Sequence, residues 1–196
     1  MPNRHAVTVA DILPRADYAR VRPEQRRRMA ALKRTRRLEV GPHITFYFES
    51  FDTMRHQVQE MCWIENGGPE QIPDELAAYN PLIPQGDELV ATFMIEIDDP
   101  DRRKRILSDL GGIEESAFIK VFGETVPGIP ETDQDRTSAD GKASSVQFVH
   151  FRFTPEQIAR FRTPGAEVVL GLSHPHYGHM AVMPEAVRAA LAEDFG

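Results

Sequence analysis

Cysteine is the scarcest reactive residue in this chain, because Cys62 is the only one among 196 residues. A single cysteine excludes an intramolecular disulfide. It also excludes zinc or iron–sulfur centres built only from thiolates of one chain. Any metal ion would therefore have to be held by histidine and carboxylate side chains.

Long apolar runs are also missing from the sequence. No stretch approaches the ~20 apolar residues that cross a bilayer, and the first residues lack the apolar core of a secretory signal. We therefore expect a cytoplasmic protein without a membrane segment. The length fits one domain with a sizeable hydrophobic core.

Several motifs that mark known chemistry are absent. The chain has no Gly-x-Gly-x-x-Gly, P-loop, His-Glu-x-x-His or Gly-x-Ser-x-Gly sequence. Nothing therefore predicts a nucleotide cofactor. A Ser-His-Asp arrangement stays open, but no pattern marks one.

Charge is distributed unevenly along the chain. The net charge is -7, yet residues 1–40 carry eleven Lys and Arg against four Asp and Glu. The remaining residues, 41–196, are strongly acidic. The balance argues against general nucleic-acid binding and predicts a basic N-terminal arm and helix, 1–40, before a single domain, 41–196.

The basic arm is predicted to contain a helix that Pro23 opens and that runs to about Leu38. Its arginines have two interpretations. They form a face that binds phosphate or a protein partner, or they are solvated and lie against the acidic surface of the domain itself.

The rest of the chain alternates between strand and helix patterns. Ile44, Phe46 and Phe48 share one face of a predicted strand, and Ala91 and Phe93 share one face of another. Each of these two apolar faces is predicted to be buried. Strands are predicted at 43–49, 88–98, 117–122, 146–153 and 166–173, with a further candidate at 181–183. Helices are predicted at 51–65, 74–79, 100–110, 155–161 and 185–195. This order predicts an α+β fold with an antiparallel or mixed sheet of about five to six strands covered by helices.

Two segments between these elements carry their own signals. Thr154, followed by Pro155 and Gln157, has the spacing of a helix-capping box, so a helix is expected to begin there. Residues 124–145 contain prolines, glycines and charges with almost nothing apolar, which predicts a flexible loop.

The densest group of reactive side chains is the segment His174-Pro-His-Tyr-Gly-His179. Imidazoles are good ligands for iron or zinc, and carboxylates often complete such sites. Candidates from elsewhere in the chain are His43, Glu49 and Glu65, so the predicted ligands are His43, His174, His179, Glu49 and Glu65. Tyr177 is the candidate catalytic or hydrogen-bonding group. The alternative is a polar turn whose histidines bond to backbone or water.

The chain resembles a bacterial domain family of unknown function whose genes often neighbour those of rubrerythrin and an iron–sulfur oxidoreductase. The residues that carry the resemblance are Gly41–Glu49, Gln57–Met61 with Ile64-Glu65, Tyr79–Pro84, Ala91-Thr92 with Ile95-Glu96, and His174–Tyr177. The resemblance implies a link to iron, peroxide or electron transfer, with rubrerythrin or the oxidoreductase as a partner. It supplies no activity.

These observations lead to competing hypotheses. The first is a metal-binding accessory protein or oxidoreductase, with iron or zinc at the histidine cluster, linked to peroxide stress or electron transfer. The second is a non-catalytic interaction module that docks on a redox partner through the arginine-rich helix. A zinc hydrolase that uses the same histidines is a weaker third.

Overall fold

The computed structural model describes residues 4–131, 137–138 and 141–196. Its helices are α1 (Arg15–Lys33), α2 (Phe51–Glu65), α3 (Ile72–Tyr79), α4 (Pro100–Ser108), α5 (Pro155–Arg162) and α6 (Glu185–Ala192). Its strands are β1 (Arg37–Val40), β2 (Ile44–Phe48), β3 (Glu88–Ile95), β4 (Ala117–Val121), β5 (Glu124–Pro130), β6 (Val146–Arg152), β7 (Val168–His174) and β8 (Tyr177–Val182). None of the described helices is both long enough and apolar enough to span a membrane.

Within the described residues, eight strands form one sheet in the order β1-β2-β3-β6-β5-β4-β7-β8. Every neighbouring pair is antiparallel, which decides between the two predicted sheet types. The sheet curls until its edge strands β1 and β8 approach each other, giving a near-closed, barrel-like shape. The predicted α+β class is confirmed, while the predicted five to six strands were too few.

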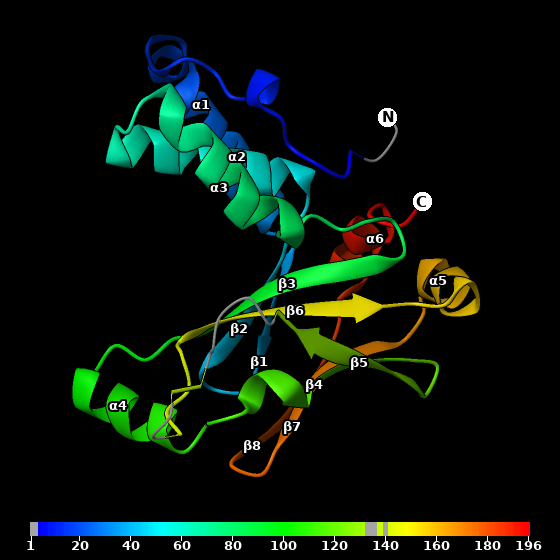
Figure 1. Cartoon of the computed structure of the whole chain (residues 1–196). Helices are drawn as coiled ribbons and strands as arrows, with labels where there is room; N and C mark the ends of the chain where they lie inside the picture. The colour runs from blue at the N-terminus through cyan, green and yellow to red at the C-terminus, as the bar shows by residue number, and fades with distance from the viewer. Residues whose placement is uncertain (1–3, 132–136, 139–140) are drawn as a thin grey trace.

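The inward faces of the strands form the main core. The predicted faces of β2 and β3 lie there, and the rings of Phe46 and Phe93 are 4.8 Å apart. A second core lies between the outer face of β3 and helices α2 and α3, where Val90 meets Met54 and Val58. Figure 1 shows α1, α2 and α3 grouped on this side of the sheet. Because β3 is covered on both sides, it is buried along most of its length.

The predicted helix boundaries in the basic arm were wrong. Helix α1 begins at Arg15, eight residues before Pro23, and ends at Lys33. Pro23 removes one backbone hydrogen bond from a helix interior, but the turn before it is held by Tyr18, which is buried and donates to Glu60 of α2. The following residues, Arg37–Val40, form β1 rather than a helix end, because their alternating exposure fits pairing with β2.

The predicted loop over 124–145 was wrong for its first seven residues, which form β5 between β4 and β6. Pro127, Gly128 and Pro130 argued against a strand. Gly128 is required here because a Cβ at this position would lie 2.6 Å from the side chain of Val149. Residues 132–136 and 139–140 of that prediction lie outside the described residues.

Candidate functional sites

Tyr177 closes the seam between the two edge strands of the sheet. Its hydroxyl accepts a hydrogen bond from the backbone N–H of His43 (2.9 Å) and donates one to the carbonyl of Val40 (2.9 Å). Burial raises the pKa of the phenol, so it stays protonated and able to donate at neutral pH. Both bonds end on backbone atoms, which makes Tyr177 a cross-link between β8 and the turn that joins β1 to β2.

Two predicted ligands, His43 and His179, lie near this phenol. The ring of Tyr177 is 4.5 Å from that of His179 and 6.4 Å from that of His43, measured between centroids. The Nε2 atom of His43 lies 3.5 Å from a guanidinium nitrogen of Arg102. The fold thus brings His43 and His179 to one region, with the tyrosine ring as the contact that they share.

His174 lies at the end of β7 and has partners for both ring nitrogens. Its Nε2 atom is 3.1 Å from the carbonyl oxygen of Gly111, and its Nδ1 atom is 3.2 Å from the backbone N–H of His176. A carbonyl can only accept and an amide N–H can only donate, so these contacts make Nε2 the donor and Nδ1 the acceptor. In this arrangement neither nitrogen offers a lone pair to a metal ion. His174 instead ties the β7–β8 turn to the segment after α4.

The two predicted carboxylate ligands, Glu49 and Glu65, have other partners in the fold. Glu49 follows β2 at the end opposite His43, about 20 Å away at ~3.3 Å per residue. It is buried, and the hydroxyls of Thr53 and Thr92 each donate to it at 2.7 Å. Glu65 is exposed at the end of α2, where it accepts from the side-chain amide of Gln71 at 2.6 Å.

The predicted metal ligands therefore occupy several separate places in the fold. Across the part of the chain that the structure describes, no three His, Cys, Asp or Glu side chains are grouped so that they could hold one ion. Metal binding by these residues stays a prediction without support from this geometry.

The arginines of the basic arm differ in whether an acidic side chain of another element lies near them. Arg22 forms a bidentate pair with Glu60 at 2.8 Å, and Arg28 lies 3.7 Å from Asp52. Four other exposed arginines of α1 and its C-terminal end are Arg20, Arg26, Arg27 and Arg34, which we call the basic face. Arg15, at the start of α1, is also exposed and lies over the ring of Trp63 instead. The interpretation that the arginines lie against acidic groups of the domain itself therefore fits Arg22 and Arg28. It does not fit the arginines of the basic face.

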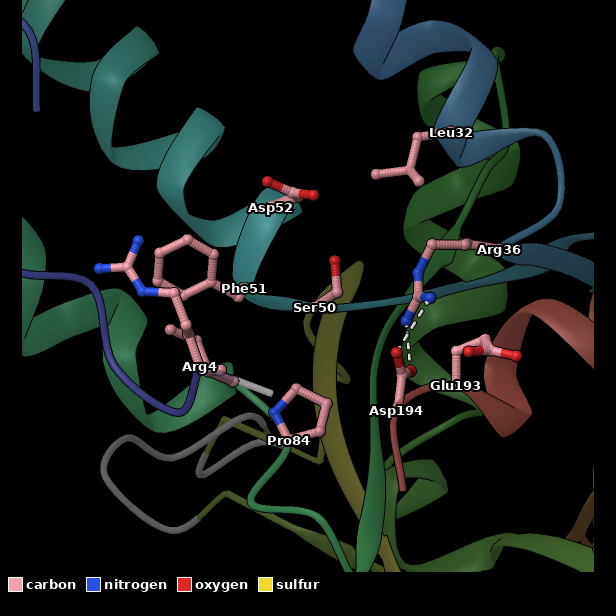
Figure 2. A pocket seen from close by; sticks show the side chains of 10 residues that line it. Arg4, Leu32, Arg36, Ser50, Phe51, Asp52, Pro84, Glu193 and Asp194 are labelled. Carbon is pink, nitrogen blue, oxygen red and sulfur yellow. Dashed lines mark hydrogen bonds and ion pairs between the residues drawn. The ribbon is translucent and has the colours of Figure 1, made fainter. Parts of the chain in front are cut away.

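Arg36 has the strongest set of partners in the basic arm. It donates to the carbonyls of Phe48 (3.1 Å) and Glu49 (2.7 Å) and forms an ion pair with Asp194. Figure 2 shows Arg36 and Asp194 facing each other. Both residues line a hollow of about 200 Å³. Arg4 and Asp52 also line this hollow, so its walls carry both positive and negative side chains. Such walls favour neither an anionic nor a cationic ligand. Arg36 is a structural anchor that joins β2 to the C-terminus.

A charge cluster around His150 was not predicted as a site. The ring of His150 on β6 lies between two carboxylates, with Nδ1 3.0 Å from Glu88 and Nε2 2.7 Å from Glu131. Burial alone would lower the pKa of His150, but its hydrogen bonds and ion pairs with Glu88 and Glu131 outweigh burial and raise it. Glu88 and Arg152 are paired residues of adjacent strands, a charge pattern that could have marked the cluster. The contact with Glu131 had no sequence signal.

This cluster predicts a pH-dependent contribution to stability. Because the folded-state pKa of His150 lies above its unfolded value of about 6.5, the stabilisation is fully present below that pH and is lost as the pH rises through the folded-state value. The difference in unfolding free energy between wild type and His150→Gln should therefore shrink between pH 6 and pH 9, by about 1.4 kcal/mol for each unit of pKa difference. Urea unfolding of both proteins at each pH measures it, and parallel curves would contradict the assignment.

The fold and these contacts define an α+β protein with a near-closed antiparallel sheet whose seam is held by Tyr177. The chain belongs to a family described as a protein of unknown function, DUF3501, whose model matches residues 6–195. This confirms the predicted resemblance to a domain of unknown function; the association with rubrerythrin and the oxidoreductase stays a proposal.

One solved structure is closely similar to this chain. It is the crystal structure of a novel protein of unknown function from Burkholderia pseudomallei K96243, with a TM-score of 0.90 and 34% sequence identity. The match covers 97% of this chain and 100% of the other. No curated protein matches the chain.

Proposed function

We propose that this protein is an interaction module that docks on an acidic redox partner through the basic face of α1. The observation that carries the proposal is the position of Arg20, Arg27 and Arg34. These residues are seven apart, so they line one side of the helix over about 21 Å at ~1.5 Å per residue. The buried residues Tyr18 and Met29 lie on the opposite side, against the rest of the protein.

The charge of the basic face is largely uncompensated. Arg20 is the exception, because it donates a hydrogen bond of 3.3 Å to the exposed carboxylate of Asp17. No carboxylate within the described ranges forms an ion pair with Arg26, Arg27 or Arg34. On a chain with a net charge of -7, such a surface favours a specific acidic partner over general binding to polyanions. Small residues between the arginines, Ala30 and Ala31, would let a partner approach the helix closely.

The partner is proposed from the family resemblance. A rubrerythrin or an iron–sulfur oxidoreductase encoded near the gene would receive α1 on an acidic surface. The metal-binding accessory role, with iron or zinc as cofactor, and the zinc hydrolase stay predictions, because the histidine geometry described above gives them no preformed centre.

The proposal is tested by titrating each candidate partner into this protein by calorimetry. Arg27→Glu combined with Arg34→Glu should weaken binding at least tenfold, because opposite charges across the interface become like charges. The wild-type affinity should fall between 50 and 300 mM salt, since exposed charges are screened. The matched control is Lys104→Glu with Arg105→Glu on α4, which lies apart from α1 in Figure 1 and changes the net charge equally.

Two results would contradict the docking proposal. One is an affinity that is equal in the α1 and α4 double variants. The other is the lack of measurable binding to either candidate partner at low salt.

A further inference from the structure

A cavity of about 430 Å³ lies between the N-terminal segment, the second half of α2 and the short 3-10 helix η2 (Pro69–Gln71). Small-molecule sites commonly have volumes of roughly 300 to 1,000 Å³ and mainly apolar walls. The apolar part of this wall includes Val9, Ile12, Leu13, Cys62, Trp63 and Ile72. Val9 and Leu13 are also among the exposed large hydrophobic residues, so apolar surface continues to the rim.

The walls of this cavity are fixed by local contacts. The side-chain amide of Gln59 on α2 accepts from the backbone N–H of Leu13 (2.7 Å) and donates to its carbonyl (3.1 Å). These two bonds hold the N-terminal segment in place. Both polar atoms of the Gln59 side chain are hydrogen-bonded in this way. On the other side, Asn66 ends α2 in the left-handed conformation (φ 56°), which turns the chain toward η2.

One charged group stands at this apolar cavity. The guanidinium of Arg15, the first residue of α1, lies 4.2 Å above the ring of Trp63 and donates through Nη1 to the Trp63 carbonyl. Among the described residues no carboxylate pairs with Arg15, whereas Arg22, 5.3 Å from the same ring, is neutralised by Glu60. Arg15 thus keeps N–H donors and a positive charge for another group.

The remaining reactive group in the wall is neutral. Burial raises the pKa of the Cys62 thiol, and the nearby negative charge of Glu75 raises it further, so the thiol is protonated at neutral pH. The same negative charge makes the Cys62 side of the cavity unfavourable for an anion. A negative group would therefore lie at Arg15, with apolar atoms directed past Trp63 toward Cys62 and Ile72.

We propose that this cavity binds a small amphiphile that has an apolar chain and a single carboxylate, with the carboxylate paired to Arg15. The apolar walls account for the chain, and the uncompensated guanidinium beside Trp63 accounts for the head group. A neutral apolar compound would fill the same space without the ion pair and should bind more weakly.

The chain supplies two reporters for this site, because Trp63 is the only tryptophan and Cys62 the only cysteine. Titration with dodecanoate, below the concentration at which it forms micelles, should give a saturable change in Trp63 fluorescence. Its affinity should exceed that of dodecanol by about tenfold, the value of one charge-assisted contact. Bound dodecanoate should also slow the reaction of Cys62 with a thiol reagent.

Arg15→Gln should reduce the preference for dodecanoate over dodecanol to near unity in the Cys62 protection assay, which does not depend on the altered contact with Trp63. Arg105→Gln, an exposed position on α4 that belongs to neither proposed site, should keep the wild-type preference. The proposal is overturned if dodecanoate gives no saturable signal, if both ligands bind wild type equally, or if Arg15→Gln keeps the preference.

Discussion

Arg36→Met should lower the free energy of unfolding by about 3–5 kcal/mol, the cost of breaking a buried ion pair from one side. Arg36 is 5% exposed, and its substitution removes the guanidinium from the carboxylate of Asp194 and from the carbonyls of Phe48 and Glu49. Urea unfolding followed by circular dichroism measures the change.

The controls for Arg36 separate charge from geometry. Arg34→Met, two residues away and exposed, should change stability by no more than about 0.5 kcal/mol. Arg36→Lys keeps the charge but loses the planar guanidinium, so its loss of unfolding free energy should lie between those of Arg34→Met and Arg36→Met. If Arg36→Met costs less than about 1 kcal/mol, Arg36 is not the anchor described here.

Gly41→Ala should destabilise the protein by about 3 kcal/mol and loosen the seam of the sheet. Gly41 has a φ of +70°, where an L side chain costs about 1–2 kcal/mol. A Cβ there would also lie 2.6 Å from the ring of His179 and 2.8 Å from the hydroxyl of Tyr177. Relieving these overlaps would displace the hydroxyl that bonds to Val40 and His43, so the steric cost adds to the backbone cost.

Gly165→Ala is the matched control for this prediction. Gly165 has nearly the same φ, +75°, but a Cβ there would meet no atom within 4 Å. It should therefore show the backbone cost alone, measured by thermal or urea unfolding. Equal losses in the two variants would show that close packing of Tyr177 and His179 on Gly41 contributes nothing to the seam.

The parts of the fold that follow from local sequence were predictable. The alternation in Ile44–Phe48 identified a buried face, and the capping box at Thr154 identified the start of α5, where both reciprocal hydrogen bonds are present. Strands β1 and β5 were not predictable in this way. Strand β5 contains proline and glycine, which are depleted in strands, and β1 is only four residues long and follows a run of basic residues. Both segments are held by pairing with neighbouring strands.

The candidate site depended on contacts that no local pattern encodes. Tyr177 meets Val40 and His43 across more than 130 residues because the sheet curls until β8 reaches β1. The spacing within His174–His179 drew attention to this region. It could not show that His174 bonds to the backbone of Gly111. The predicted strand over 43–49, by contrast, already placed His43 and Glu49 at opposite ends. Likewise, the sequence showed that α1 is rich in arginine, but it could not show which of these arginines have acidic partners.

The most direct test of the docking proposal is a charge-swap experiment on the basic face of α1. Arg27→Glu with Arg34→Glu should weaken binding to the redox partner at least tenfold, and a partner variant with two acidic residues of its docking surface changed to arginine should restore most of the lost affinity. Recovery of binding only in the swapped pair is the result that we expect. If no swapped pair recovers binding, or if the α1 variant binds the unmodified partner as wild type does, the basic face is not a docking surface.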